Sequence, residues 1–185
     1  MRVIIGGIGY RNLRDHSVGV MVTDILEWRE WPDHIAVEDL SYGPIAVVQR
    51  FEDDPPERRF DRAIFVAASA RGDGRAPGAV TAYRWDGVLP TPERIQGAVG
   101  EAVTGVIAID NTLVVGRYFG ALPDEVIVVE VEPEVEAPGE AFGPTVEAAF
   151  QSICGLVTKL ALDPAAAAEL PLAPLGGVRP GAAAR

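Results

Sequence analysis

The chain has 185 residues, of which 48% are hydrophobic and 23% charged, and it carries a formal net charge of −11. This length and composition predict one soluble globular domain with a sizeable core. The acidic balance argues against a nucleic-acid-binding face, and no apolar run is long enough to cross a bilayer. The glycine-rich N-terminal stretch does not fit a signal peptide, and the single cysteine suits a reducing compartment, so we expect a cytoplasmic protein.

The first predicted unit is a strand, a glycine turn, a polar loop and a helix. The apolar run Val3–Ile5 ends at three nearby glycines, and Asp15 and Ser17 are typical of the start of a helix that continues to Trp28. In an open α/β sheet, ligands bind outside the carboxyl ends of the strands. We therefore expect Asp15 and the adjacent His16 to lie at that edge.

The rest of the chain alternates strands and helices. We predict strands over 34–37, 60–68, 79–85 and 125–131, and helices over 44–51, 106–119 and 144–162. The connection before 79–85 is too short for a crossover helix, so this strand is predicted to pair antiparallel. Residues 93–105 are predicted to be irregular, and 132–143 form an acidic, proline-containing loop.

This order of elements predicts an α/β fold. We expect a three-layer sandwich in which a mostly parallel central sheet of about five strands has helices on both faces. The folded domain is predicted to span residues 1–162. Residues 163–185 are rich in alanine, proline and glycine, and this composition predicts a disordered tail.

The opening motif resembles that of the nickel–iron hydrogenase maturation proteases, the endopeptidases that trim the C-terminal tail of the hydrogenase large subunit after nickel insertion. The family pattern is Gly-x-Gly-Asn, a short gap, and Asp-Glu-x-x-Gly-Val. Here residues 7–10 are Gly-Ile-Gly-Tyr and residues 15–20 are Asp-His-Ser-Val-Gly-Val. An Ala-Pro-Gly at 76–78 and a Gly-Pro-Thr-Val at 143–146 also match the family's order and spacing, over residues 1–162.

The resemblance implies three metal ligands, which the family uses to bind the nickel of its substrate. In this chain the corresponding positions hold His16 in place of Glu, Ala67 in place of Asp, and Thr104 in place of His. Tyr10 stands in place of the family's Asn, and Glu38 occupies the place of an acidic residue at the end of the second strand. Nickel would therefore reach this protein only through its substrate, and we expect no tightly bound cofactor.

The residues themselves leave two interpretations of His16. With Glu38 or Asp39 it could form a metal site at the sheet edge, because imidazole and carboxylate are ligands that nickel and zinc accept. Alternatively, His16 hydrogen-bonds a neighbour or a partner and changes charge near neutral pH. Asp15, His16 and Glu38 are the candidate catalytic residues, whereas Cys154 lies on an apolar helix face and is predicted to pack in the core.

Three functional hypotheses follow. The first is a maturation-protease-like protein that docks on a hydrogenase large subunit, or a related metalloenzyme precursor, with degenerate or absent proteolysis. The second is an active endopeptidase with a rearranged site built from Asp15, His16 and Glu38. The third is a small-ligand binding module on the same fold.

Overall fold

A computed structural model of the chain describes residues 1–177, and its central feature is a six-stranded sheet in the order β2-β1-β3-β5-β4-β6. The strands are β1 (Val3–Gly7), β2 (Ile35–Asp39), β3 (Arg62–Ala68), β4 (Val80–Trp85), β5 (Glu125–Val131) and β6 (Leu172–Ala173). The helices are α1 (Val18–Glu27), α2 (Pro44–Glu52), α3 (Pro92–Val103), α4 (Ile109–Tyr118), α5 (Pro144–Leu162) and α6 (Pro164–Ala168), with 3-10 turns at Arg14–Ser17 and Pro56–Arg58.

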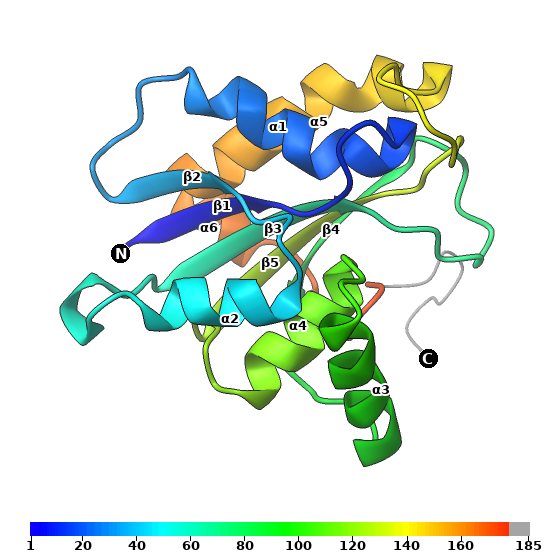
Figure 1. Ribbon diagram of the computed structural model, residues 1–185. Helices are drawn as coiled ribbons and strands as arrows, with labels where there is room; N and C mark the ends of the chain where they lie inside the picture. Colours follow the sequence, from blue (N-terminus) through cyan, green and yellow to red (C-terminus); the bar gives the residue numbers. More distant parts are fainter. Residues whose placement is uncertain (178–185) are drawn as a thin grey trace, which may run out of the picture.

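Helices cover both faces of the sheet. In Figure 1, α1 and α5 lie above the sheet, whereas α2, α3 and α4 lie below it. The buried apolar residues divide accordingly, because alternate residues of each strand point to opposite faces. One core joins α1 and α5 to the sheet, and another joins α2 and α4 to it. The predicted three-layer α/β sandwich is confirmed.

Most of the sheet is parallel, as predicted. Strands β2, β1, β3 and β5 all run in the same direction, and β4 pairs antiparallel with β5. The bounds of β5 and α5 agree with the sequence prediction to the residue. None of the described helices is both long enough and apolar enough to cross a membrane.

Two glycines let α1 pack closely on the sheet. A Cβ on Gly7 would lie 2.2 Å from the carbonyl oxygen of Gly19, and a Cβ on Gly19 would lie 2.2 Å from that of Val66. Both contacts are far inside van der Waals distance, and both are with backbone atoms that cannot rotate away. The backbone of α1 is therefore set directly against the ends of β1 and β3, which brings the residues before α1 to the carboxyl edge.

The structure differs from the sequence prediction after residue 162. The Asp163 carboxylate accepts hydrogen bonds from the backbone N–H groups of Ala165 and Ala166 and so caps α6, and Ala167 is fully buried. The chain then forms β6, which pairs with the edge of β4. Ala166 and Ala167 pack in the same core as α5, so this segment is folded although its composition is typical of disorder. The remainder of the predicted tail, 178–185, lies outside the described residues.

The region 93–105 also differs, because it forms most of α3. Pro92 occupies the first turn, where its missing N–H is tolerated, and the small residues Ala98 and Ala102 make the buried face. The predicted helix over 106–119 begins three residues later, at Ile109.

We predict that Gly19→Ala lowers the free energy of unfolding by about 1–3 kcal/mol, because its Cβ must displace backbone. The matched control is Gly155→Ala in α5, where a Cβ meets nothing within 4 Å. That change should raise the unfolding free energy by up to about 1 kcal/mol, because alanine favours a helix. Urea unfolding of both variants measures this, and equal effects would contradict the close approach of α1.

Candidate functional site

A cavity of about 600 Å³ opens at the carboxyl edge of the sheet, where the sequence places Asp15 and His16. Its walls come from the loop before α1, the end of β3, the α3–α4 connection and the β5–α5 loop. Polar and charged residues line much of it, namely Tyr10, His16, Ser69, Arg71, Arg94, Glu101, Asp110, Asn111 and Glu136. This cavity, called the edge cleft below, is the candidate functional site.

Asp15 holds one wall of the edge cleft in place. Its side chain is fully buried, and its carboxylate accepts backbone hydrogen bonds from Glu134 and Val135, both at 2.7 Å, and from Gly143 at 2.6 Å. These three N–H groups belong to the β5–α5 loop. Asp15 therefore ties that loop to the start of α1, and its oxygen atoms are already engaged by backbone donors.

His16 and Tyr10 form the neighbouring wall. The Nε2 atom of His16 lies 3.6 Å from a carboxylate oxygen of Glu136 and has no hydrogen-bond partner among the described residues. The Tyr10 hydroxyl accepts a hydrogen bond of 2.7 Å from the backbone N–H of Ile107. Tyr10, at the position of the family's Asn, thus links the β1–α1 loop to the α3–α4 connection.

The structure gives Glu38 and Asp39 other partners. Arg50 of α2 donates two hydrogen bonds to the Glu38 carboxylate, at 2.5 and 2.8 Å. Asp39 instead accepts from Arg11, at 3.0 Å, on the α1 side of the sheet. The two carboxylates therefore point to opposite faces, as neighbours in a strand should. Asp15, His16 and Glu38 each contact a different set of groups.

The positions that the resemblance assigns to metal ligands do not supply a metal site. Ala67 is buried near the end of β3, and Thr104 is the C-terminal cap of α3. The residue directly before α4 is Ala108, which has no ligand atom in its side chain either. Within residues 1–177 no group of three or more His, Cys, Asp or Glu side chains is arranged to hold a metal ion. The donor set therefore does not fit a resident nickel or zinc ion.

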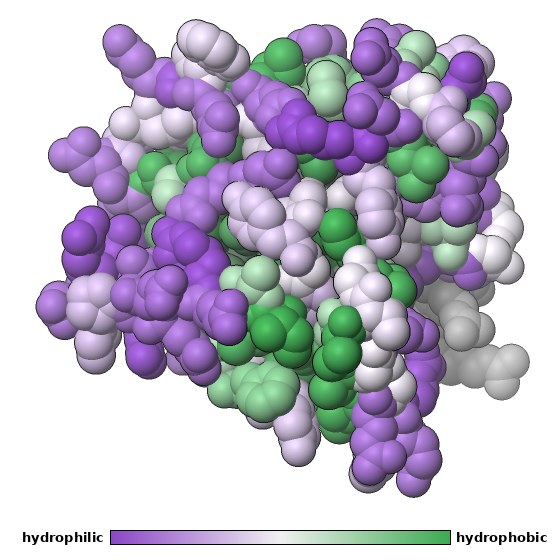
Figure 2. Space-filling model, viewed as in Figure 1, coloured by the Kyte–Doolittle hydropathy of each residue, from purple (hydrophilic) through white to green (hydrophobic). Residues whose placement is uncertain are grey.

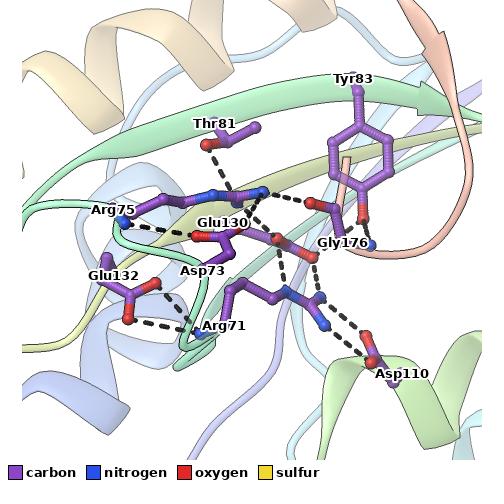
Figure 3. Close-up of polar contacts among 9 residues, drawn as sticks. All are labelled: Arg71, Asp73, Arg75, Thr81, Tyr83, Asp110, Glu130, Glu132 and Gly176. Atoms are coloured by element: carbon purple, nitrogen blue, oxygen red, sulfur yellow. Dashed lines mark hydrogen bonds and ion pairs between the residues drawn. The ribbon is translucent and has the colours of Figure 1, made fainter. Parts of the chain in front are cut away.

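A buried charge cluster, called the Arg71 network below, lies beside the edge cleft (Figure 3). Glu130 of β5 is only 1% exposed, and its carboxylate accepts hydrogen bonds from Arg71, Arg75 and the Tyr83 hydroxyl, the last at 2.9 Å. Arg71 also binds both carboxylate oxygens of Asp110 in the first turn of α4, each at 2.8 Å. The network fixes the β3–β4 connection against β5 and α4.

Further bonds extend the Arg71 network to the segment after β6. The Arg75 guanidinium donates to the carbonyl oxygen of Gly176 and to the Thr81 hydroxyl, and pairs with Asp73 at 3.2 Å. The backbone N–H of Gly176 donates to the Tyr83 hydroxyl at 3.0 Å. A second cavity of about 580 Å³ lies on this side, and Arg71 and Asp110 line both cavities.

Burial and pairing change the acid–base behaviour of this cluster. Burial alone would lower the pKa of the Arg71 guanidinium, but hydrogen bonds from Arg71 to Asp110 and Glu130 raise that pKa above its usual range. Burial and the nearby charge of Glu130 raise the pKa of Tyr83 above its ordinary value. Both groups therefore hold their protons over the whole physiological pH range.

Sequence reasoning placed Asp15 and His16 at the edge but missed the Arg71 network. One feature pointed to it: Glu130 is the acidic residue inside the apolar run of 125–131, and a buried carboxylate needs a partner. Cys154, as predicted, is buried in the core, and burial raises the pKa of its thiol.

We predict that Asp15→Asn lowers the free energy of unfolding by about 2–4 kcal/mol, because an amide nitrogen cannot accept the backbone N–H bonds that the carboxylate accepts. Amide hydrogen exchange should speed up first in the loop 132–143. Glu140→Gln, at an exposed position in the same loop, is the matched control and should change stability by less than about 0.5 kcal/mol. Unchanged exchange in Asp15→Asn would contradict this role.

Alkaline pH should destabilise the fold through Tyr83. Its pKa is raised in the folded state, so above about pH 10 the unfolded chain loses a proton that the folded chain keeps, and stability falls as the pH rises. Urea unfolding at pH 9 to 11 should give a shallower decline for Tyr83→Phe than for the wild type. Tyr118→Phe, at an exposed tyrosine, should decline as the wild type does. Equal slopes for all three proteins would refute the assignment.

Several solved structures with a similar fold are hydrogenase maturation proteases. The hydrogenase maturating endopeptidase HybD from E. coli is 24% identical, with 86% of this chain and 92% of that chain covered and a TM-score of 0.63. The hydrogenase 2 maturation peptidase from a Thaumarchaeota archaeon is 20% identical, with 86% and 97% covered and a TM-score of 0.59. The [NiFe] hydrogenase maturation protease HybD from Thermococcus kodakarensis is 16% identical, with 87% and 99% covered and a TM-score of 0.56.

No protein-family model and no curated sequence matches the chain. At identities below one quarter, the structural likeness shows the fold, and the predicted hydrogenase maturation protease-like fold is confirmed.

Proposed function

We propose that this protein docks on a nickel–iron hydrogenase large subunit, or on a related metalloenzyme precursor, and assists its maturation without cutting it. The observation that carries the proposal is a maturation-protease fold in which residues 1–177 place no set of metal ligands at the edge cleft. His16, Ala67 and Thr104 occupy the positions where the resemblance implies ligands. The maturation proteases use these ligands to recognise the nickel of the substrate. Without them, this protein would not recognise the cleavage site through the metal.

The surface beside the edge cleft supports a docking role. Hydrophobic residues gather over α3 and α4 in the space-filling view (Figure 2). At the α3–α4 connection, Val103 is 77% exposed and Val106 is 37% exposed, and Val106 also lines the edge cleft. Exposed apolar residues at the rim of a cavity are typical of a protein interaction site.

The test mixes the purified protein with a large-subunit precursor that still carries its C-terminal extension. We expect a complex by biolayer interferometry and no change in the precursor's intact mass, because binding persists while cleavage does not. Val103→Asp should weaken the complex at least tenfold, since it places a charge on the apolar rim.

The matched control is Leu162→Asp. Leu162 is 51% exposed at the far end of α5, away from the edge cleft, so its charge should leave binding unchanged. If no complex forms, the docking proposal fails, and a small-ligand binding module becomes the better explanation. If the precursor is shortened, the protein is an endopeptidase.

A working endopeptidase is the second candidate, and the pairing of His16 with Glu136 favours it. A histidine whose Nε2 lies 3.6 Å from a carboxylate at the wall of a cavity is a candidate general base. The other two predicted catalytic residues already have partners. Asp15 accepts hydrogen bonds from backbone N–H groups, and Glu38 accepts them from Arg50. Calorimetric titration with nickel and zinc separates the candidates: tight one-to-one binding that is lost in His16→Ala favours the endopeptidase, and absence of binding favours docking.

A further inference from the structure

Helix α3 is attached to the rest of the protein by little apolar packing. Only Ala98 and Ala102 of its 12 residues are buried, and each has a single methyl group as its side chain. The helix packs mainly on α4 and to a smaller extent on α2, and Figure 1 shows it at the outside of the layer below the sheet. Because burial stabilises in proportion to apolar area, α3 is held less firmly than α5, which buries large side chains such as Phe150 and Ile153.

Two glycines weaken the same helix from within. Gly97 and Gly100 lie in its middle, and a Cβ at either position would meet no atom within 4 Å. Close packing therefore requires a glycine at neither position. A glycine inside a helix is destabilising relative to alanine, because it loses more conformational freedom on folding. Beyond the end of α3, Gly105 has a φ of 83°, in the left-handed region, and marks the point where the chain turns toward α4.

Helix α3 also supplies a wall that the two cavities share. Arg94 and Ala98 line the edge cleft and the second cavity of about 580 Å³, and the connection after α3 reaches the edge cleft through Val106. In that connection, the backbone N–H of Ile107 donates a hydrogen bond of 2.7 Å to the Tyr10 hydroxyl on the opposite wall. A movement of α3 away from α4 would therefore open both cavities at once, and the bond to Tyr10 opposes that movement.

We propose that residues 92–108 form a lid over the two cavities, that the Tyr10 hydroxyl holds this lid closed, and that the docking partner opens it. The inference rests on the proposed docking function for the partner, but not for the lid itself. Val106 is 37% exposed and lines the edge cleft, so an open lid presents more of it, together with Val103, to the partner. The partner buries more apolar surface on the open state than on the closed one, and this difference favours opening.

The lid is tested first without a partner, by the reaction of buried thiols with the aromatic disulfide DTNB. Ala98→Cys places a thiol in the small core that α3 shares with α4, where the reagent reaches it only when the lid opens. The native Cys154, buried in the core beside α1, is the reference in the same molecule. Relative to its rate in the unfolded chain, the introduced thiol should react about tenfold faster than Cys154 or more, because a lid opens more often than the main core.

Two changes, each made together with Ala98→Cys, should shift the opening in opposite directions. Tyr10→Phe removes the bond that holds the lid and should speed the reaction of the introduced thiol about threefold or more. Gly97→Ala/Gly100→Ala strengthens α3 and should slow that reaction about threefold or more. The matched control is Gly155→Ala in α5, which also adds a methyl group where nothing lies within 4 Å and should leave the rate unchanged.

Binding of the large-subunit precursor then tests whether docking opens the lid. These measurements use the same substitutions with the native Ala98. If the partner selects the open lid, Tyr10→Phe should bind the precursor about threefold more tightly than the wild type, because the competent state is more populated. Gly97→Ala/Gly100→Ala should bind correspondingly more weakly, and Gly155→Ala should bind as the wild type does.

The outcomes separate this inference from the docking proposal. If no variant forms a complex, docking is refuted, and the thiol reactions still decide whether the lid exists. The lid is refuted if the introduced thiol reacts no faster than Cys154, or if neither Tyr10→Phe nor the double glycine variant changes its rate. If the lid opens but all variants bind the precursor equally, the coupling to docking is refuted. Should Ala98→Cys fail to fold, Ala102→Cys takes its place, at the other buried position of α3.

Discussion

The buried carboxylate of Glu130 is the constraint on which the carboxyl edge of the sheet depends. A charge with 1% exposure is too costly to bury alone, and removing the partners of such a group typically costs several kcal/mol. Arg71, Arg75 and Tyr83 meet this need from two separate elements. Because these partners also bind Asp110 and Gly176, satisfying one carboxylate fixes the β3–β4 connection, α4 and the segment after β6 together.

The opposite wall of the edge cleft is built on the same principle with different groups. Asp15 is also fully buried, but its partners are backbone N–H groups of the β5–α5 loop and not arginines. One acidic side chain therefore holds each side of the cleft. Neither carboxylate is free to act on a substrate, whereas the Nε2 of His16 has no hydrogen-bond partner among the described residues.

Local patterns in the sequence were enough to predict most of the fold. The β-branched run of β5 and the long amphipathic pattern of α5, with proline in its first turn, fix both elements to the residue. Helix α3 and the α6–β6 segment were missed for a shared physical reason. Their buried positions are mostly alanines, such as Ala98 and Ala167, and a small side chain carries little periodic signal although it packs tightly.

The site was predictable only in part, because its partners are distant in sequence. The helix-start pattern placed Asp15 and His16 at the edge, and the two-residue period of a strand correctly separated Glu38 from Asp39. The pairing of Arg71 with Glu130 spans 59 residues, and nothing local to either residue specifies the other. Which arginine meets which carboxylate is decided by the sheet order β3-β5-β4, which exists only once the chain has folded.

The short strand β6 has a consequence for the way the protein folds. It covers part of the outer edge of β4, and the Gly176 contact that follows it joins residues 101 positions apart. Contacts of such long range form late, because the loop they close costs much chain entropy. Until then, β4 presents unpaired backbone groups to any neighbouring chain. A partly folded chain in which β6 has not yet paired therefore exposes more of this edge than the native state does, and it is more prone to aggregate.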